Sequence, residues 1–113
     1  MNMPPQSTGR LFLKLGCALP RADVVARLEQ NHSLTFSARS SDYLGEYELH
    51  ELNGRRVKVL SNVTPPDEDS TLEPDWPGLP TIIHVTAKTG DPLMHALLRE
   101  PDLQTLSGPK PLG

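Results

Sequence analysis

The residue types that could carry out catalysis or bind a metal are few and widely spaced in this chain. The four histidines, His32, His50, His84 and His95, form no H-x-x-x-H pair, and Cys17 is the single cysteine. Zinc sites and disulfide frameworks need closely spaced Cys and His ligands or paired thiols. No nucleotide-binding glycine pattern and no G-x-S-x-G elbow occurs either. We therefore expect no metal, no cofactor and no catalytic residue, and predict that the chain is not an enzyme.

Some of these residues have a structural interpretation beside the chemical one. His84 lies in an apolar run, where a hydrogen-bonded structural histidine is commoner than a base or a ligand. Cys17 comes just before a predicted helix that could activate the thiol, but a small buried thiol is the usual role. Glu46 and Glu48 share a strand face and could form a carboxylate pair, although no general base or pocket accompanies them.

Carboxylates are concentrated in the middle of the chain. Nine of the fourteen Asp and Glu residues lie between residues 40 and 80, against three Lys or Arg, so this stretch has a formal charge of −6. The rest of the chain has a formal charge of +3, and the net value of −3 hides the asymmetry. A concentrated negative field attracts basic proteins and repels nucleic acid and anionic membranes. We expect a basic protein partner, and neither nucleic acid nor a membrane.

Two segments of this stretch combine carboxylates with large aromatic side chains, and we predict that they bind the partner. The first segment contributes Asp42, Tyr43, Glu46 and Glu48. The second, which is rich in proline, contributes Asp67, Glu68, Asp69, Glu73, Asp75 and Trp76. Carboxylates would speed the encounter with a basic surface, and the aromatic rings would anchor it. The simpler interpretation is a solvated acidic loop whose tryptophan packs onto the protein's own core.

The arrangement of these segments also carries a resemblance. The motif Ser-Ser-x-Tyr-x-Gly-acid-Tyr at residues 40–47 follows a predicted β-α-β start and precedes a hairpin, and the acidic loop precedes a late strand. Between residues 10 and 100 this resembles the small bacterial immunity proteins of contact-dependent growth inhibition and related polymorphic toxin systems. The resemblance implies a non-catalytic cytoplasmic inhibitor that masks the active site of a cognate toxin domain.

Many toxins of these systems are basic nucleases, so the resemblance further implies that an acidic protein would mimic the nucleic acid substrate. Two other classes of function remain open from the residues alone. One is a small chaperone or adaptor for a secreted effector, which would expose an apolar groove. The other is a small-molecule-binding α+β domain, which would enclose His50 or His84 together with Glu48 in a deep pocket.

The length of 113 residues suits a single domain with one modest core. Much of the proline lies at the ends and in one loop, so we expect a domain at residues 10–106 between flexible tails at 1–9 and 107–113. A single cysteine, with no signal-type apolar segment and no transmembrane run, predicts a cytoplasmic protein. The oligomeric state stays open.

Apolar periodicity predicts an α+β fold, a two-layer sandwich with a mainly antiparallel four- to five-stranded sheet and two helices on one face. Helices are expected at 20–31, with Pro20 in the first turn and Asn31 as the end, and at 92–100, after Asp91 as N-cap. Strands are expected at 10–15, 34–38 and 81–87. Two more strands should flank a hairpin turn at Asn53-Gly54, and a short edge strand is expected at 103–106.

The Asn53-Gly54 turn predicts a register in which Glu51 lies opposite Arg56 and Tyr47 opposite Leu60. In that register the apolar residues of the two strands lie on opposite sides of the sheet, so they do not indicate which side faces the core. Tyr47 and Leu49 lie on one side, whereas Val57 and Val59 lie on the other. Either a β-bulge or a partly covered sheet face would reconcile them.

Overall fold

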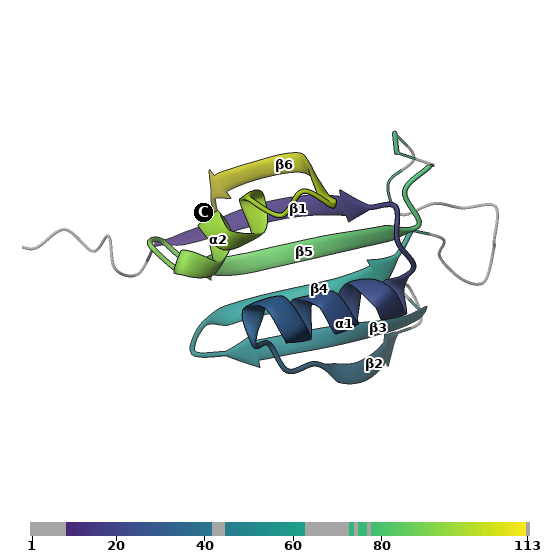
Figure 1. Ribbon diagram of the computed structural model, residues 1–113. Coiled ribbons are helices and arrows are strands. Elements are labelled where there is room, and N and C mark those ends of the chain that lie inside the picture. Colours follow the sequence, from purple (N-terminus) through teal and green to yellow (C-terminus); the bar gives the residue numbers. More distant parts are fainter. Residues whose placement is uncertain (1–8, 42–44, 63–72, 74, 77, 113) are drawn as a thin grey trace, which may run out of the picture.

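The computed structural model describes residues 9–41, 45–62, 73, 75–76 and 78–112, and Figure 1 shows how their helices and strands are arranged. In chain order the elements are β1 (Arg10–Cys17), α1 (Arg21–His32), β2 (Ser37–Ser41), β3 (Gly45–Leu52), β4 (Arg55–Ser61), β5 (Thr81–Lys88), α2 (Pro92–Leu98) and β6 (Leu103–Pro111). The strands form one sheet in the order β2-β3-β4-β5-β1-β6, and every neighbouring pair is antiparallel. The fold is therefore α+β, with six strands in place of the four or five expected.

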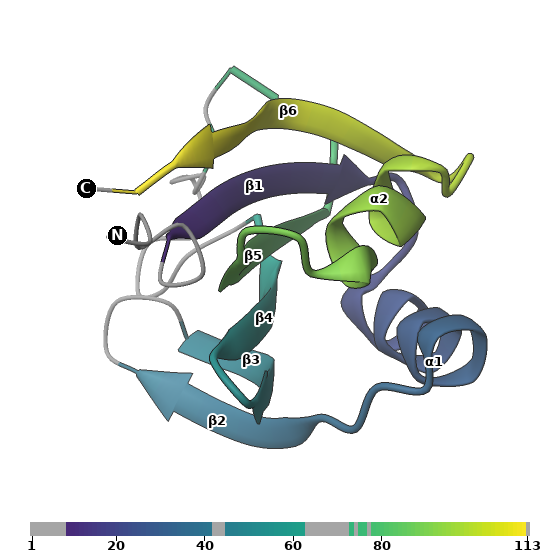
Figure 2. The same ribbon diagram turned by 90° about the vertical axis from the view of Figure 1, so that its left-hand side faces the viewer.

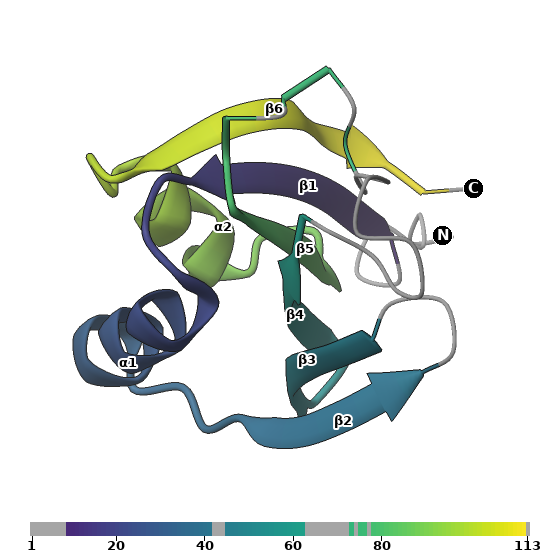
Figure 3. The same ribbon diagram turned by 90° about the vertical axis from the view of Figure 1, so that its right-hand side faces the viewer.

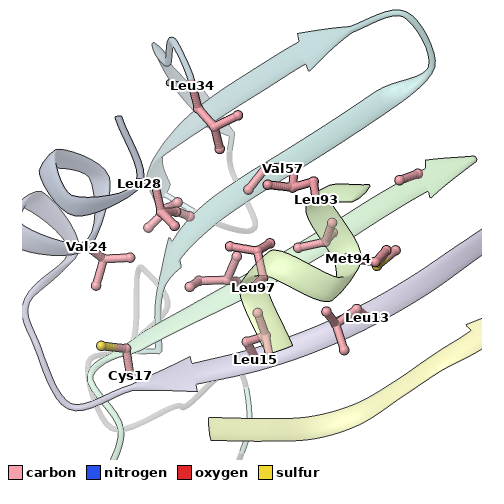
Figure 4. Packing of buried hydrophobic residues seen from close by; sticks show 14 residues of the cluster. Leu13, Leu15, Cys17, Val24, Leu28, Leu34, Val57, Leu93, Met94 and Leu97 are labelled. Atoms are coloured by element: carbon pink, nitrogen blue, oxygen red, sulfur yellow. The ribbon is translucent and has the colours of Figure 1, made fainter. Parts of the chain in front are cut away.

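Both helices lie on the same side of the sheet, as the two edge views show (Figures 2 and 3). Alternate residues of the central strands point toward them, because successive side chains of a strand point to opposite faces. Figure 4 shows these side chains packing against Leu93, Met94 and Leu97 of α2 and against Val24 and Leu28 of α1. The strand residues of this core are Leu13, Leu15, Cys17, Val57, Val59, Ile83, Val85 and Ala87.

The hairpin register predicted from Asn53-Gly54 is confirmed. Both residues have positive φ, 51° and 83°, and the pairing runs without a shift from Leu52–Arg55 to Tyr47–Leu60. Because this pairing contains no bulge, the other alternative applies: the apolar residues of the two strands lie on opposite sides of the sheet, and one of these sides is only partly covered. Glu48 and His50 share the helix side with Val57 and Val59, and Tyr47 and Leu49 lie on the side without helices.

The predicted boundaries of the first helix and the second strand are wrong by a few residues. Pro20 precedes α1 as its N-cap, and the helix continues past Asn31 to His32, with Ser33 as its C-cap at the left-handed φ of 57°. The following strand begins at Ser37, not at Leu34. Leu34 is nevertheless buried in the core, so its apolar character reflects packing from a connecting segment and not a place in the sheet.

The C-terminal strand is much longer than the short edge expected. β6 runs from Leu103 to Pro111 and pairs with β1, with register shifts near Lys14. Residues 107–111, which we placed in a flexible tail, therefore belong to the sheet. Proline is compatible with this position because β6 is an edge strand, where a missing N–H on the outer side breaks no ladder bond.

Asp91 caps α2 as predicted and also ties the helix to the sheet. Its Oδ1 accepts a hydrogen bond from the N–H of Leu93 at 2.9 Å, and its two carboxylate oxygens accept from Arg55 of β4 at 2.7 and 2.9 Å. These hydrogen bonds with Arg55 are the main cause that lowers the pKa of Asp91. The bidentate pair fixes the start of α2 over the hairpin end of the sheet.

Candidate functional site

The two acidic segments singled out in the sequence attach to the same end of the sheet. The first connects β2, which ends at Ser41, to β3, which begins at Gly45. The second leaves β4 at Ser61 and enters β5 at Thr81, and these two residues are themselves paired across the strands. Antiparallel pairing of β2, β3, β4 and β5 therefore attaches both connections at the same end of the sheet.

Asn62 anchors the longer of these connections at its base. The side chain is 1% exposed, and its Nδ2 donates to the carbonyl oxygens of Trp76 and Leu79, each at 2.8 Å. Its Oδ1 accepts from the N–H of Glu73 at 2.7 Å. One buried amide thus satisfies three backbone groups of the segment 73–79, which would otherwise lack partners in the interior. Nothing in the local sequence pattern marked Asn62 for this role.

Two of the predicted partner-binding carboxylates are bound by the protein itself on the helix side of the sheet. Arg21, at the start of α1, lies 3.1 Å from Glu48 and 3.7 Å from Glu46. The guanidinium also donates to Ser61 Oγ at 3.0 Å. Glu48 is largely covered, whereas 82% of the Glu46 side chain remains exposed. Glu46 can therefore still meet a partner, and Glu48 is engaged within the chain.

A third carboxylate lies on the opposite side of the sheet. Glu73 Oε2 pairs with Lys14 Nζ at 2.8 Å, with both side chains about four-fifths covered. Asp75 is exposed and Trp76 is half-buried. Among the described residues, the structure therefore does not gather the predicted carboxylates on one surface. The remaining predicted site residues, Asp42, Tyr43, Asp67, Glu68 and Asp69, lie outside the described residues.

The side of the sheet without helices, which we call the open face, carries the feature that the sequence reading missed. Strand alternation places a mixture of cationic and aromatic side chains there. They are Arg10, Phe12, Lys14, Arg39, Tyr47, Arg56, Lys58, His84, Lys88 and Lys110. All four lysines of the chain are among them. Alternate residues of each strand point to the open face. The sequence signal for this face is therefore a set of cations at alternate positions, spread over five strands.

Two of these cations have carboxylate partners: Lys14 pairs with Glu73, and Arg56 with Glu51 at 2.6 Å. Lys58 lies over the ring of Tyr47, 5.6 Å from its centroid. Within the described part of the chain, no carboxylate lies within ion-pair distance of Lys58 or Arg10. The open face therefore keeps uncompensated positive charge.

His84 lies in the middle of the open face and does not have the role expected of it. Its ring makes an edge contact with Phe12, with centroids 5.6 Å apart, and its Nε2 is buried without a hydrogen-bond partner among the described residues. Burial, aided by the positive charges of Lys14 and Lys58 and opposed by Glu73, lowers the pKa of His84 to about 4. The ring is therefore neutral at pH 7.

Shallow hollows lie on both faces of the sheet. One of about 130 Å³ is lined by Phe12, Arg56, Lys58, His84 and Thr86, and an adjacent one of about 310 Å³ shares Arg56 and Thr86 with it. A third, of about 340 Å³, lies beside Arg21, Glu46, Tyr47 and Glu48. His84 and Glu48 thus line different hollows, and the deep pocket that would favour a small-molecule domain does not form from this pair.

Metal and membrane interpretations find no support in the described residues. No group of three or more His, Cys, Asp or Glu side chains there is placed to hold a metal ion. Neither described helix is long and apolar enough to cross a bilayer. Cys17 is 2% exposed, and its Sγ accepts a weak hydrogen bond from the N–H of Leu19 at 3.5 Å, as a small buried thiol does.

The anchoring role of Asn62 predicts a large effect of a nearly isosteric change. Asn62→Asp replaces a double donor with oxygens that face two carbonyl groups, so the free energy of unfolding should fall by about 3 kcal/mol. Asn53→Asp, in the exposed hairpin turn, makes the same chemical change where aspartate is also accepted, and should cost under about 1 kcal/mol. Urea unfolding of both variants measures the difference. Equal losses would remove Asn62 from the account.

The neutral state of His84 predicts an acid-sensitive stability. Its pKa lies near 4 in the folded chain and near 6.5 in the unfolded chain, so below pH 6.5 the unfolded state binds more protons. The stabilising contribution is fully present above pH 6.5 and is lost as the pH falls to about 4, with an upper bound of roughly 3 kcal/mol. Unfolding of the wild type should therefore become easier with acid more steeply than that of His84→Gln. Parallel stability curves, or an NMR titration of His84 near pH 6.5, would contradict this.

Comparisons of the chain with protein-family models, with curated proteins and with solved structures find no match.

Proposed function

We propose that this chain is a cytoplasmic immunity protein that binds and neutralises a cognate bacterial toxin domain. The toxin would be basic at the surface that meets the two acidic connections, as a nuclease cleft is. Inhibition would be stoichiometric and non-catalytic. The motif at residues 40–47 suggests this class, and the arrangement of the sheet offers a surface that such a protein needs.

The observation that carries the proposal is the convergence of both acidic connections on one end of the sheet. Their attachment points, Ser41, Gly45, Ser61 and Thr81, belong to four neighbouring strands. Asn62 holds the returning part of the longer connection against this end. A rigid base that presents carboxylates lowers the entropy lost when they meet a partner.

Internal ion pairs narrow the set of residues that the proposal uses. Glu48 and Glu73 are engaged by Arg21 and Lys14, so they position the site and do not meet the toxin. Glu46, Asp75 and Trp76 stay accessible at the same end of the molecule. Together with Asp42, Tyr43, Asp67, Glu68 and Asp69, they form the partner-binding surface that we propose.

Co-expression tests this function directly. We expect a secreted protein with a variable C-terminal domain to be encoded next to this chain. Expression of that C-terminal domain alone should stop growth, and this chain should restore growth and co-purify with the domain in a one-to-one complex. An unrelated immunity protein serves as the control. Continued growth arrest, with no complex formed, would refute the proposal.

Charge reversal tests the acidic surface within that complex. In the triple variant Asp67→Lys, Glu68→Lys, Asp69→Lys, association should slow by about tenfold or more at low salt, and its dependence on ionic strength should flatten. The dissociation rate should change less, because steering charges act mainly on the encounter. Stopped-flow association at several salt concentrations measures both effects. An unchanged association rate would exclude these three residues.

A further inference from the structure

The open face is a charged surface of the described residues that the proposed function leaves unused. Seven of the eleven Lys and Arg residues of the chain point to it. Three of the other basic side chains, Arg21, Arg27 and Arg55, are paired with carboxylates on the helix side. Among the described residues, cations without a carboxylate partner therefore gather where no helix covers the sheet.

We propose that the open face is a second docking surface, and that it binds carboxylate side chains of a protein partner. Lys58 and Arg10 would contact these carboxylates. The inference rests on the proposed function only for the identity of the partner, which would be the toxin domain. The toxin would then present acidic residues beside its basic cleft.

The hollows give this surface its shape. Phe12, Arg56, Lys58, His84 and Thr86 surround the smaller one, so a carboxylate that enters it meets Lys58, which has no ion-pair partner among the described residues, and Arg56, which is paired with Glu51. Lys58 is partly buried and its Nζ lies over the ring of Tyr47, which reduces the entropy lost when its ammonium group is bound. Arg10 lines the adjacent hollow and offers a guanidinium fork that matches a carboxylate.

Nucleic acid is the other class of polyanion that a cationic sheet can bind, and the side chains favour carboxylates over it. Base stacking needs free aromatic faces. Here Lys58 covers the ring of Tyr47, and Phe12 and His84 meet each other edge to face. Glu51 and Glu73 also lie among the cations, beside Arg56 and Lys14, where they would repel a continuous phosphate chain.

Discrete carboxylates on a protein surface can avoid those two positions. A second copy of this chain is a poor occupant of the same face, since two copies meeting through it would bring like charges together. The pattern of cations, carboxylates and covered rings thus fits a protein partner whose carboxylates are separate side chains, in contrast to a continuous phosphate chain.

An NMR titration of the whole, isotope-labelled chain tests the inference with two probes, a decaglutamate peptide and a thymidine decanucleotide. We expect decaglutamate to shift the amide signals of Phe12, Lys58, His84 and Thr86, and to be released as NaCl rises from about 50 to about 300 mM. The decanucleotide should bind more weakly. Tighter binding of the decanucleotide, or peptide-induced shifts confined to α1 and α2, would overturn the inference.

Matched substitutions identify the cations that act. Lys58→Glu and Arg10→Glu should each weaken decaglutamate binding several-fold, and should weaken binding of the toxin domain about tenfold. Arg99→Glu, an equal change of charge on an exposed residue beside α2, should leave both unchanged. Lys58→Met removes the charge but keeps a long unbranched side chain, and so separates loss of charge from loss of packing.

Equal losses in Arg99→Glu and Lys58→Glu would show a general charge effect and would contradict the inference. Failure of the proposed function has a different signature. In that case the wild-type chain would not bind the toxin domain at all, whereas the peptide titration would still show whether the open face takes carboxylates.

Discussion

The alternation of side chains along β1, β4 and β5 is the constraint on which the rest of the structure depends. One set of alternate residues is apolar and is covered by α1 and α2. The other set includes Leu60 and Ile82, which are also buried, together with the charged residues of the open face. On that second side the chain places Lys14, Lys58 and His84 at the centre of the sheet. The same register that builds the core therefore also determines the composition of the open face.

Opposite charges are separated in this molecule by the order of its strands. The two connections at one end of the sheet carry six of the fourteen acidic residues, and the open face carries unpaired cations. The internal pair Arg21–Glu48 lies on the helix side of the sheet, and the internal pair Lys14–Glu73 lies on the open face. They hold the site in place and remove those carboxylates from the surface. A partner that fits both regions must carry a complementary pattern, which is a source of specificity.

Local patterns in the sequence predicted the elements whose causes are local. The hairpin followed from Asn53-Gly54, and the start of α2 from Asp91-Pro92, because turn and cap preferences act within a few residues. β6 was underestimated because Pro109 and Pro111 usually end a strand, and only its edge position explains their acceptance. The pairs of Arg21 with Glu48 and of Lys14 with Glu73 join residues 27 and 59 positions apart, so no local pattern could predict them. The open face was missed for the same reason, since its cations come from five separate strands.

The four lysines offer a direct measurement of the central claim, which is that the partner binds on the side of the sheet without helices. Lys14, Lys58, Lys88 and Lys110 all point to that side. The acetylation rate of each lysine, measured by mass spectrometry in the free chain and in the complex, shows how strongly the partner shields that lysine from the reagent. We predict that Lys58 reacts several-fold more slowly in the complex, while arginine modification at Arg99 is unchanged. Equal acetylation of all four lysines in the free and the bound chain would contradict the account.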